Sequence, residues 1–128
     1  MEVRSIARPD LAHSRVMRAE LPEVVLELRE LLGASLTAYL GSVKETRAVN
    51  QWAAGERTPS AGVDQRLRLA LQLALMISEA DGPRVAQSWF MGMNPVLDDD
   101  APARLLREGE LEAVGPQLVG AARAFLAA

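Results

Sequence analysis

Residues 35–59 contain two short helical patterns separated by a break, and this segment constrains the fold more than any other. The first pattern has apolar residues at the i, i+3, i+4 and i+7 spacing of one helix face: Leu36, Tyr39, Leu40 and Val43. Ser35 is the expected N-cap of this helix, and Gly41 and Ser42 interrupt the pattern. Ser42 and Glu45 have the spacing of a capping box, which predicts that a second helix starts at about Val43.

The second helix is expected to bury one side and to end sharply. Its predicted inward residues are Val49, Trp52 and Ala53. Gly55 is the expected left-handed C-cap, and Pro59 is expected to begin the next segment. Two short helices joined by a tight turn predict a helix-turn-helix.

The other faces of this second helix carry hydrogen-bonding side chains. These residues are Lys44, Thr46, Arg47, Asn50 and Gln51. Arg and Lys suit guanine and phosphate, and Asn and Gln can bind adenine through two hydrogen bonds, so the face has the chemistry needed to read a major groove. The same residue types are also typical of a solvated face in a plain helical hairpin. Residues 44–57 hold three basic and two acidic residues, so we expect weak binding by one copy and a dimer as the DNA-binding form.

The composition predicts an all-α protein. The chain has 128 residues, of which 49% are hydrophobic, enough for one compact domain or two small subdomains that share a core. It has few β-branched runs and no alternating polar and apolar stretch. It has no cysteine and a single histidine, His13, so we expect no disulfide, metal or cofactor site and no enzymatic activity. Without a signal peptide or an apolar run long enough to span a bilayer, a cytoplasmic location is expected.

Three regions are predicted along the chain. Residues 1–20 contain Pro9 and lack a sustained period, so they are expected to form a flexible leader, either an arm that enters a minor groove or a solvated tail. Residues 21–61 are the expected helix-turn-helix domain, which a helix with Pro22 at its N-terminus opens and Gly33 ends. That helix has a predicted inward stripe made of Val24, Val25, Leu28, Leu31 and Leu32. Residues 62–128 are the expected C-terminal helical domain.

A long helix over about residues 60–80 is expected to be shared by the two domains. It has two apolar stripes, the first with Val63, Leu67, Ala70, Leu71, Ala74 and Ile77, and the second with Leu69, Leu73, Met76 and Ala80. A helix that is apolar on two sides must be covered on two sides. We expect the helix-turn-helix on one side, and the C-terminal half or another subunit on the other. Arg66 and Arg68 near its start are expected to be surface residues.

The C-terminal half is predicted to contain three more helices. The first follows Gly82, runs to Asn94 and has the expected inward residues Ala86, Trp89, Phe90 and Met93. The aspartates at 98–100 are expected to act in N-capping and solvation rather than in cation binding. A short helix is expected to end at Gly109. The last helix is expected to kink or split at Pro116, which would leave residues 120–128 as a short mobile piece.

The region from about residue 21 to the C-terminus resembles the Xre/MbcA/ParS-like antitoxin family. The matching residues occur in the family's order: Trp52, Gly55, Pro59, Arg66, Arg68, Trp89, Asn94, Pro95, Leu97, Pro102, Leu105, Leu106, Gly109 and Val114. The most specific part is Asn-Pro-x-Leu followed by Pro-x-x-Leu-Leu and then Gly. The resemblance implies an Xre-like helix-turn-helix packed on a C-terminal toxin-binding domain.

By this resemblance the chain looks like the antitoxin of a RES-Xre type II toxin-antitoxin pair, whose toxin carries a RES domain that degrades cellular NAD. Such antitoxins cover the toxin's active-site cleft with a C-terminal segment, and the complex often represses its own operon, which implies a homodimer and higher-order complexes with toxin. The implied DNA-binding residues are Lys44, Thr46, Arg47, Asn50, Gln51 and Arg57. The implied toxin-binding residues are Gly120, Arg123, Phe125, Leu126, Ala127 and Ala128.

Two alternatives remain open from the sequence. Phe125 and Leu126 can anchor an interface and Arg123 can meet an anionic group, but Phe125 can instead close the last helix onto the core. The whole chain can also be a stand-alone transcriptional regulator, in which the C-terminal half only dimerises or senses a ligand.

Overall fold

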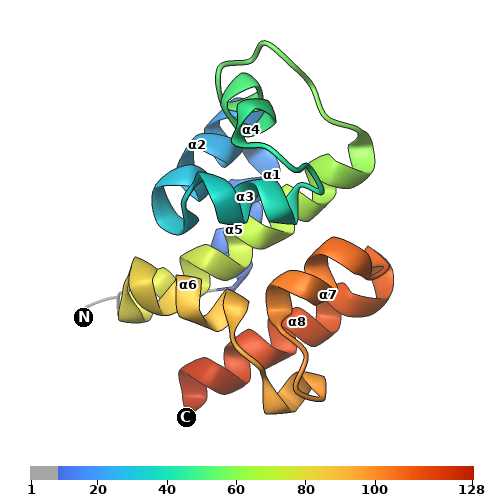
Figure 1. The fold of residues 1–128 in the computed structure, drawn as a ribbon. Coiled ribbons are helices and arrows are strands. Elements are labelled where there is room, and N and C mark those ends of the chain that lie inside the picture. The colour runs from blue at the N-terminus through green and yellow to red at the C-terminus, as the bar shows by residue number, and fades with distance from the viewer. Residues whose placement is uncertain (1–8) are drawn as a thin grey trace, which may run out of the picture.

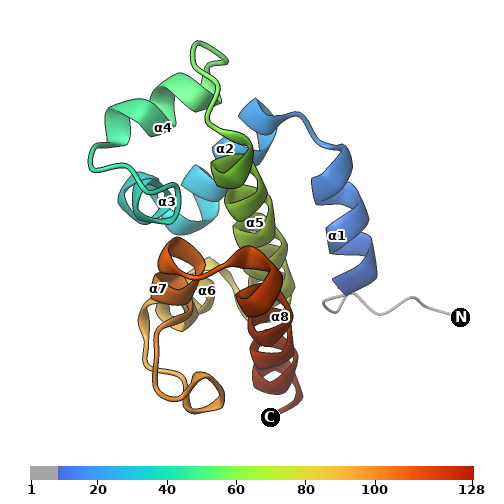
Figure 2. The same cartoon turned by 90° about the vertical axis from the view of Figure 1, so that its right-hand side faces the viewer.

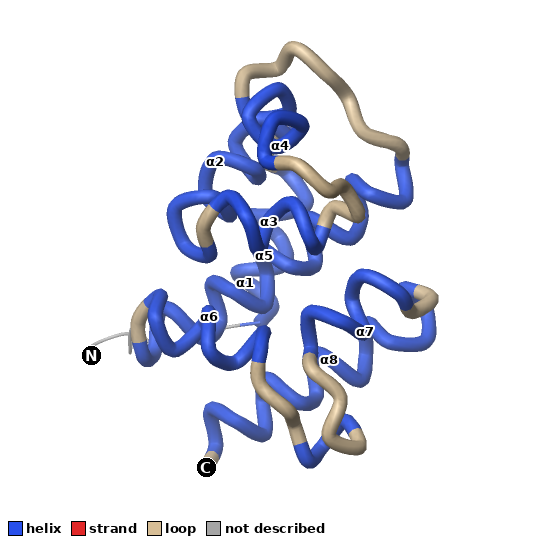
Figure 3. The backbone as a smooth tube through the Cα atoms, viewed as in Figure 1, coloured by secondary structure: helices blue, strands red, loops and turns tan. Residues whose placement is uncertain are grey.

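The computed structural model describes the backbone of residues 9–128 and the side chains of residues 13–128, and this part of the chain is helical with no strand. The prediction of an all-α protein is therefore confirmed. The elements are α1 (Pro9–Arg18), α2 (Leu21–Leu32), α3 (Ala34–Leu40), α4 (Thr46–Ala53), α5 (Ala61–Asp81), α6 (Pro83–Met91), the 3-10 helix η1 (Pro95–Leu97), α7 (Pro102–Glu108) and α8 (Leu111–Ala127). Figure 1 shows their arrangement, and Figure 3 shows that the longest loop after α1 joins α4 to α5.

Helix α5 lies at the centre of the fold and is covered on more than one side, as its apolar stripes predict. The Ser60 side chain accepts a hydrogen bond from the Val63 amide (3.3 Å) and caps the first turn. Its buried residues run without interruption from Ala70 to Ile77, because α1, α2, α6 and α8 all pack against it (Figures 1 and 2). The cover on the C-terminal side comes from the same chain. Ala80 is exposed, so the predicted second stripe is one turn too long.

The prediction of a flexible leader is wrong for the part that the structure describes. Residues 9–18 form α1, which packs on α5 and buries Val16 to 1% exposure. Arg68 of α5 donates hydrogen bonds to the carbonyls of Val16 and Ala19, both at 2.7 Å, and so satisfies the C-terminal end of α1. One buried valine leaves no periodic pattern in the sequence, and the cap comes from a residue some fifty positions away. Residues 1–8 of the predicted leader lie outside the described residues.

Helix α2 agrees with its prediction, whereas α3, the helix before the turn, differs from its prediction in its N-cap and in its buried face. Helix α2 has Pro22 in its first turn and ends at Gly33, as predicted. Gly33, which has φ +88°, is also the N-cap of α3, so the predicted N-cap role of Ser35 is wrong. The hydroxyl of Thr37 donates to the Gly33 carbonyl (2.8 Å), which allows this polar side chain to be fully buried. Tyr39 is 36% exposed, so its predicted inward position is wrong.

The capping box predicted for the second helix does not form. Ser42 lies in the turn with φ +60°, and α4 begins only at Thr46, without a side-chain cap. Gly41 explains the tight turn, because a Cβ atom there would lie 2.7 Å from Cζ3 of Trp52. The other end of α4 is as predicted. Gly55 has φ +75°, and the amides of Gly55 and Glu56 donate to the carbonyls of Trp52 (3.1 Å) and Gln51 (2.9 Å), a Schellman arrangement.

Helices α6 and α7 follow Gly82 and end before Gly109 much as predicted, with two corrections. Helix α6 ends at Met91 rather than at Asn94, and Met93 is 80% exposed instead of buried. The aspartates do not cap α7, since its N-cap is Ala101 without a side-chain bond. Asp100 instead forms an ion pair with Arg104 (3.3 Å).

The last helix is continuous, so the predicted split at Pro116 is wrong. Helix α8 runs from Leu111 to Ala127 with Pro116 inside it. The hydrogen bond that proline removes would be accepted by the carbonyl of Glu112, an exposed residue whose carbonyl can turn to water. Ala121 and Ala122 are buried against the core, so residues 120–127 form the last turns of α8 rather than a separate mobile piece.

Candidate functional site

Helix α4 presents one polar face to solvent, because its opposite face is fully used in packing. Its buried residues are Ala48, Val49, Trp52 and Ala53, which include the three predicted inward residues. Lys44, Arg47, Gln51 and Arg57 line one shallow hollow of about 400 Å³ on the outer side. We call the surface formed by these four residues with Thr46 and Asn50 the α4 surface. The structure thus brings four of the six predicted DNA-binding residues together around one depression.

The remaining two predicted residues, Thr46 and Asn50, do not line that hollow. Asn50 is exposed, and its side-chain oxygen accepts a hydrogen bond from Arg29 of α2 at 2.9 Å. Thr46 lines a second hollow, which it shares with Lys44, Tyr39 and Arg107. Arg29 and Arg107 are therefore members of this region that the sequence interpretation missed. No local signal marks them, because Arg29 and Asn50 are 21 positions apart and Arg107 and Tyr39 are 68 apart.

The cations of the α4 surface keep their charge available for a partner. Side-chain ion pairs within the described residues involve only Arg15, Arg68 and Arg104 as cations. Lys44, Arg47 and Arg57 have no carboxylate of this part of the chain within ion-pair distance, although Glu45 lines the same hollow. The surface is therefore locally basic on a chain whose net charge is −3. Unpaired Arg and Lys with neighbouring amide side chains suit contacts to phosphates and base edges.

Arg66 and Arg68 do not belong to a binding surface, because both hold helix ends. Arg66 donates to the carbonyls of Leu106 and Gly109, each at 3.1 Å, and so ties the C-terminal end of α7 to α5. Arg68 holds α1 in the same way and also pairs with Asp64 at 2.6 Å. Their predicted placement as surface arginines is corrected, since both are partly buried.

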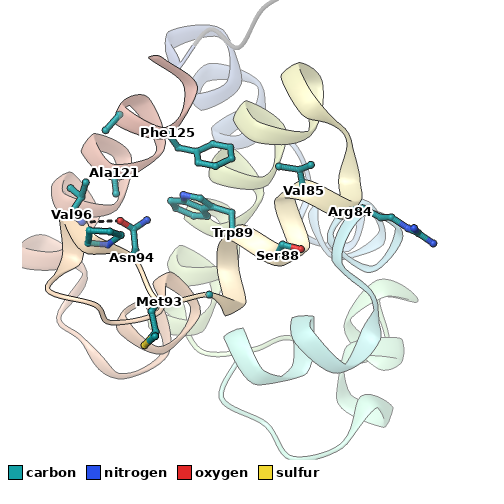
Figure 4. Close-up of a pocket in the computed structure, with 12 residues that line it drawn as sticks. Arg84, Val85, Ser88, Trp89, Met93, Asn94, Val96, Ala121 and Phe125 are labelled. Atoms are coloured by element: carbon teal, nitrogen blue, oxygen red, sulfur yellow. Dashed lines mark hydrogen bonds between the residues drawn. The ribbon is translucent and has the colours of Figure 1, made fainter. Parts of the chain in front are cut away.

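A second candidate region is an apolar groove between α6, η1 and α8. We call it the C-terminal groove, and Figure 4 shows its lining. It has a volume of about 550 Å³ and is lined mainly by apolar residues: Val85, Trp89, Met93, Pro95, Val96, Ala121, Ala124 and Phe125. Met93, Val96 and Phe125 are exposed, and Figure 4 shows Phe125 on the α8 side with Trp89 beneath it. Exposed apolar side chains gathered around one hollow are typical of an interaction site.

Trp89 is part of the core and the floor of the groove at once. It is 6% exposed and packs edge-to-face on Phe90, with ring centroids 5.2 Å apart and an interplanar angle of 85°. Its indole N–H is buried and has no hydrogen-bond partner among the described residues. An unpaired buried donor costs free energy, so this N–H is an unfavourable feature of the core.

The residues predicted to bind a toxin divide into two groups. Gly120, Arg123, Phe125, Ala127 and Ala128 are exposed along the end of α8, and Phe125 also lines the C-terminal groove. Leu126 is half-buried and packs against the core. Ala121 and Ala122 are buried and hold the end of α8 in the core, so the exposed residues beyond them can contact another protein without disturbing it.

Other kinds of site have little support within residues 9–128. No group of three His, Asp or Glu residues in this part of the chain is arranged to hold a metal ion, and no described helix is long and apolar enough to cross a membrane. Asp100 raises the pKa of Arg104, and Glu108, which accepts a hydrogen bond from Arg104, raises it further. This pairing neutralises Arg104 locally.

The sequence matches no protein-family model, and neither the curated proteins nor the solved structures include a significant match.

Proposed function

We propose that this chain is an antitoxin that binds and inhibits a RES-domain, NAD-degrading toxin through its C-terminal half and binds its operator DNA through the α4 surface. The observation that carries the proposal is the C-terminal groove, an exposed apolar site bordered by the segment that the family resemblance assigns to toxin binding. The polar α4 surface supports the DNA-binding part.

The inhibitory contact is best made by the end of α8 acting as a preformed helix. Ala121 and Ala122 hold this helix in the chain's own core, so it does not need to fold when it binds, and the entropic cost of ordering is small. Phe125 supplies an aromatic anchor, and the exposed Arg123 supplies a guanidinium that suits a carboxylate or phosphate group in a nucleotide pocket. Met93 and Val96 extend the apolar surface along the groove.

The DNA-binding part requires two copies of the chain. One α4 surface carries three cations that pair with no carboxylate of the described residues, and so few cations make few phosphate contacts and bind a duplex weakly. A dimer doubles these contacts and presents two helices to successive major grooves. The operator is thus expected to have two similar half-sites.

The experiment that tests inhibition is co-expression with a RES-domain protein, followed by pull-down and measurement of cellular NAD. The informative variant lacks residues 123–128, because it keeps Ala121 and Ala122 in the core. We expect wild type to preserve NAD and this variant to lose protection while its circular dichroism spectrum stays helical, with a somewhat lower melting temperature because the half-buried Leu126 is removed. The matched control is Gln117→Ala, an exposed change on the same helix that should retain protection. Full protection by the folded truncation would contradict the proposed contact.

A second candidate function is a stand-alone transcriptional regulator with the same fold. It is favoured by the C-terminal groove, a largely apolar hollow of about 550 Å³ with the size and lining of a small-ligand site. The two functions predict different neighbouring genes and different effects of the protein on cellular NAD. A neighbouring RES-domain gene and protection of NAD support the antitoxin, whereas DNA binding without either supports the regulator.

A further inference from the structure

Arg107 lies in the C-terminal half but is fastened to the helix-turn-helix region. Its Nη1 atom donates to the carbonyl of Tyr39 in α3 at 2.7 Å, and its Cζ atom lies 4.6 Å from the centre of the Tyr39 ring. The guanidinium is therefore held by a hydrogen bond and a cation–π contact together. Figure 2 shows α4, α3 and α7 along one side of the molecule, with α1 on the other.

This position makes Arg107 a neighbour of the α4 surface. A hollow of about 380 Å³ is lined by Arg107 and Tyr39 together with Lys44 and Thr46. Lys44 also lines the adjoining hollow with Arg47 and Arg57. Val43 and Lys44 line both hollows, so the hollows adjoin, and the cations around them extend from α7, past the start of α4, to the loop that follows α4.

The charge of Arg107 is free, in contrast to that of its neighbour on α7. Within the described residues no carboxylate pairs with Arg107, and the carbonyl of Tyr39 accepts its one hydrogen bond. Arg104, one turn earlier, is bound by both Asp100 (3.3 Å) and Glu108 (3.4 Å). A guanidinium that is oriented, partly desolvated by an aromatic ring and not neutralised is well suited to a phosphate group.

We propose that Arg107 contacts a backbone phosphate of the same duplex that the α4 surface reads. The inference rests on the proposed DNA binding and adds a contact from the half of the chain assigned to the toxin. Because a phosphate contact carries no sequence information, removal of Arg107 should weaken binding to all duplexes alike. Tyr39 acts as a positioning residue that keeps the guanidinium beside Lys44 and Thr46.

The test is the salt dependence of binding by the full chain to a fluorescently labelled duplex of mixed sequence, measured by anisotropy over a series of KCl concentrations. Arg107→Gln should reduce the slope of log K against log salt concentration by about 0.9 for each phosphate that is no longer neutralised. Lys44→Gln should have a comparable effect. Arg107→Lys keeps the charge but not the planar fork, so it should retain the wild-type slope with weaker binding.

Two control variants separate a phosphate contact from a general charge effect. Arg104→Gln removes an arginine from the same helix whose charge Asp100 and Glu108 already neutralise, so the slope should not change. Arg84→Gln removes one positive charge at the C-terminal groove and should also leave the slope unchanged.

The possible failures are distinguishable. If Lys44→Gln and Arg47→Gln lower the slope but Arg107→Gln does not, the inference about Arg107 is overturned and the proposed DNA binding stands. If Arg107→Gln lowers the melting temperature and the affinity with the slope unchanged, its role is structural and the inference is again overturned. If Arg107→Gln abolishes capture of the RES-domain protein with the DNA slope unchanged, the arginine serves the protein partner instead. If wild type does not bind the duplex at low salt, the DNA-binding part of the proposed function fails, and this inference with it.

Discussion

The α4 surface and the C-terminal groove lie on the same small helical core, but they are assembled in different ways. The α4 surface comes from one short stretch of sequence, residues 44–57, and is polar because the opposite face of one helix is buried. The C-terminal groove combines α6, η1 and the end of α8, from Arg84 to Phe125, and is largely apolar. A site on one helix can be inferred from periodicity, whereas a site between helices depends on how those helices pack.

The largest expected effect comes from Trp89→Ala, which tests whether the groove is separable from the core. The change removes a nearly buried indole and its packing on Phe90, so it should lower the free energy of unfolding by about 3–5 kcal/mol. Urea unfolding followed by circular dichroism measures this. A decrease of less than about 1 kcal/mol would show that Trp89 lines the groove without supporting the core.

The next effect comes from Arg66→Met, which tests how firmly α7 is tied to the central helix that supports both regions. Methionine keeps the apolar stem of this partly buried residue but removes the hydrogen bonds to Leu106 and Gly109, at an expected cost of about 1.5–3 kcal/mol. Amide hydrogen exchange should accelerate in α7. Arg84→Met, an exposed change, should stay within about 0.5 kcal/mol of wild type. Equal exchange rates in α7 of wild type and Arg66→Met would contradict a tethering role.

Gly41→Ala is expected to damage the α4 surface while it spares the groove. Gly41 has φ −84°, so the conflict is one of space, with the new Cβ 2.7 Å from the Trp52 ring. The overpacking should cost about 1–3 kcal/mol and weaken duplex binding more than capture of the RES-domain protein. Gly62→Ala is the control, because its nearest neighbour is the flexible Arg66 side chain at 3.5 Å. Equal decreases in both activities would show that the two regions are not independent.

The smallest effect on stability is expected from Met93→Gln, which changes an exposed residue of the groove, whereas Trp89→Ala changes a buried one. Met93 is among the most exposed apolar side chains, so the free energy of unfolding should change by less than about 0.5 kcal/mol. Capture of the RES-domain protein should nevertheless weaken, since an apolar contact is replaced by an amide. Unchanged capture by this variant would remove Met93 from the interface.

The errors of the sequence interpretation have a common physical origin. The leader, the capping box and the split of α8 are inferences from local signals, namely Pro9, the Ser42 and Glu45 spacing, and Pro116. In the structure distant contacts override each of them. Arg68 caps α1, Trp52 packs against Gly41 in the turn, and the burial of Ala121 and Ala122 holds α8 together.

Three features of this protein follow from its residues read in order: the all-α class, the central α5 that needs cover on two sides, and the polar outer face of α4. Each of them depends on the 3.6-residue periodicity of a single helix. The exposure of Met93, the hydrogen bond between Arg29 and Asn50 and the contact of Arg107 with Tyr39 became visible only in the folded molecule. The two pairs join residues 21 and 68 positions apart. They depend on the packing of several helices around α5, which no local pattern records.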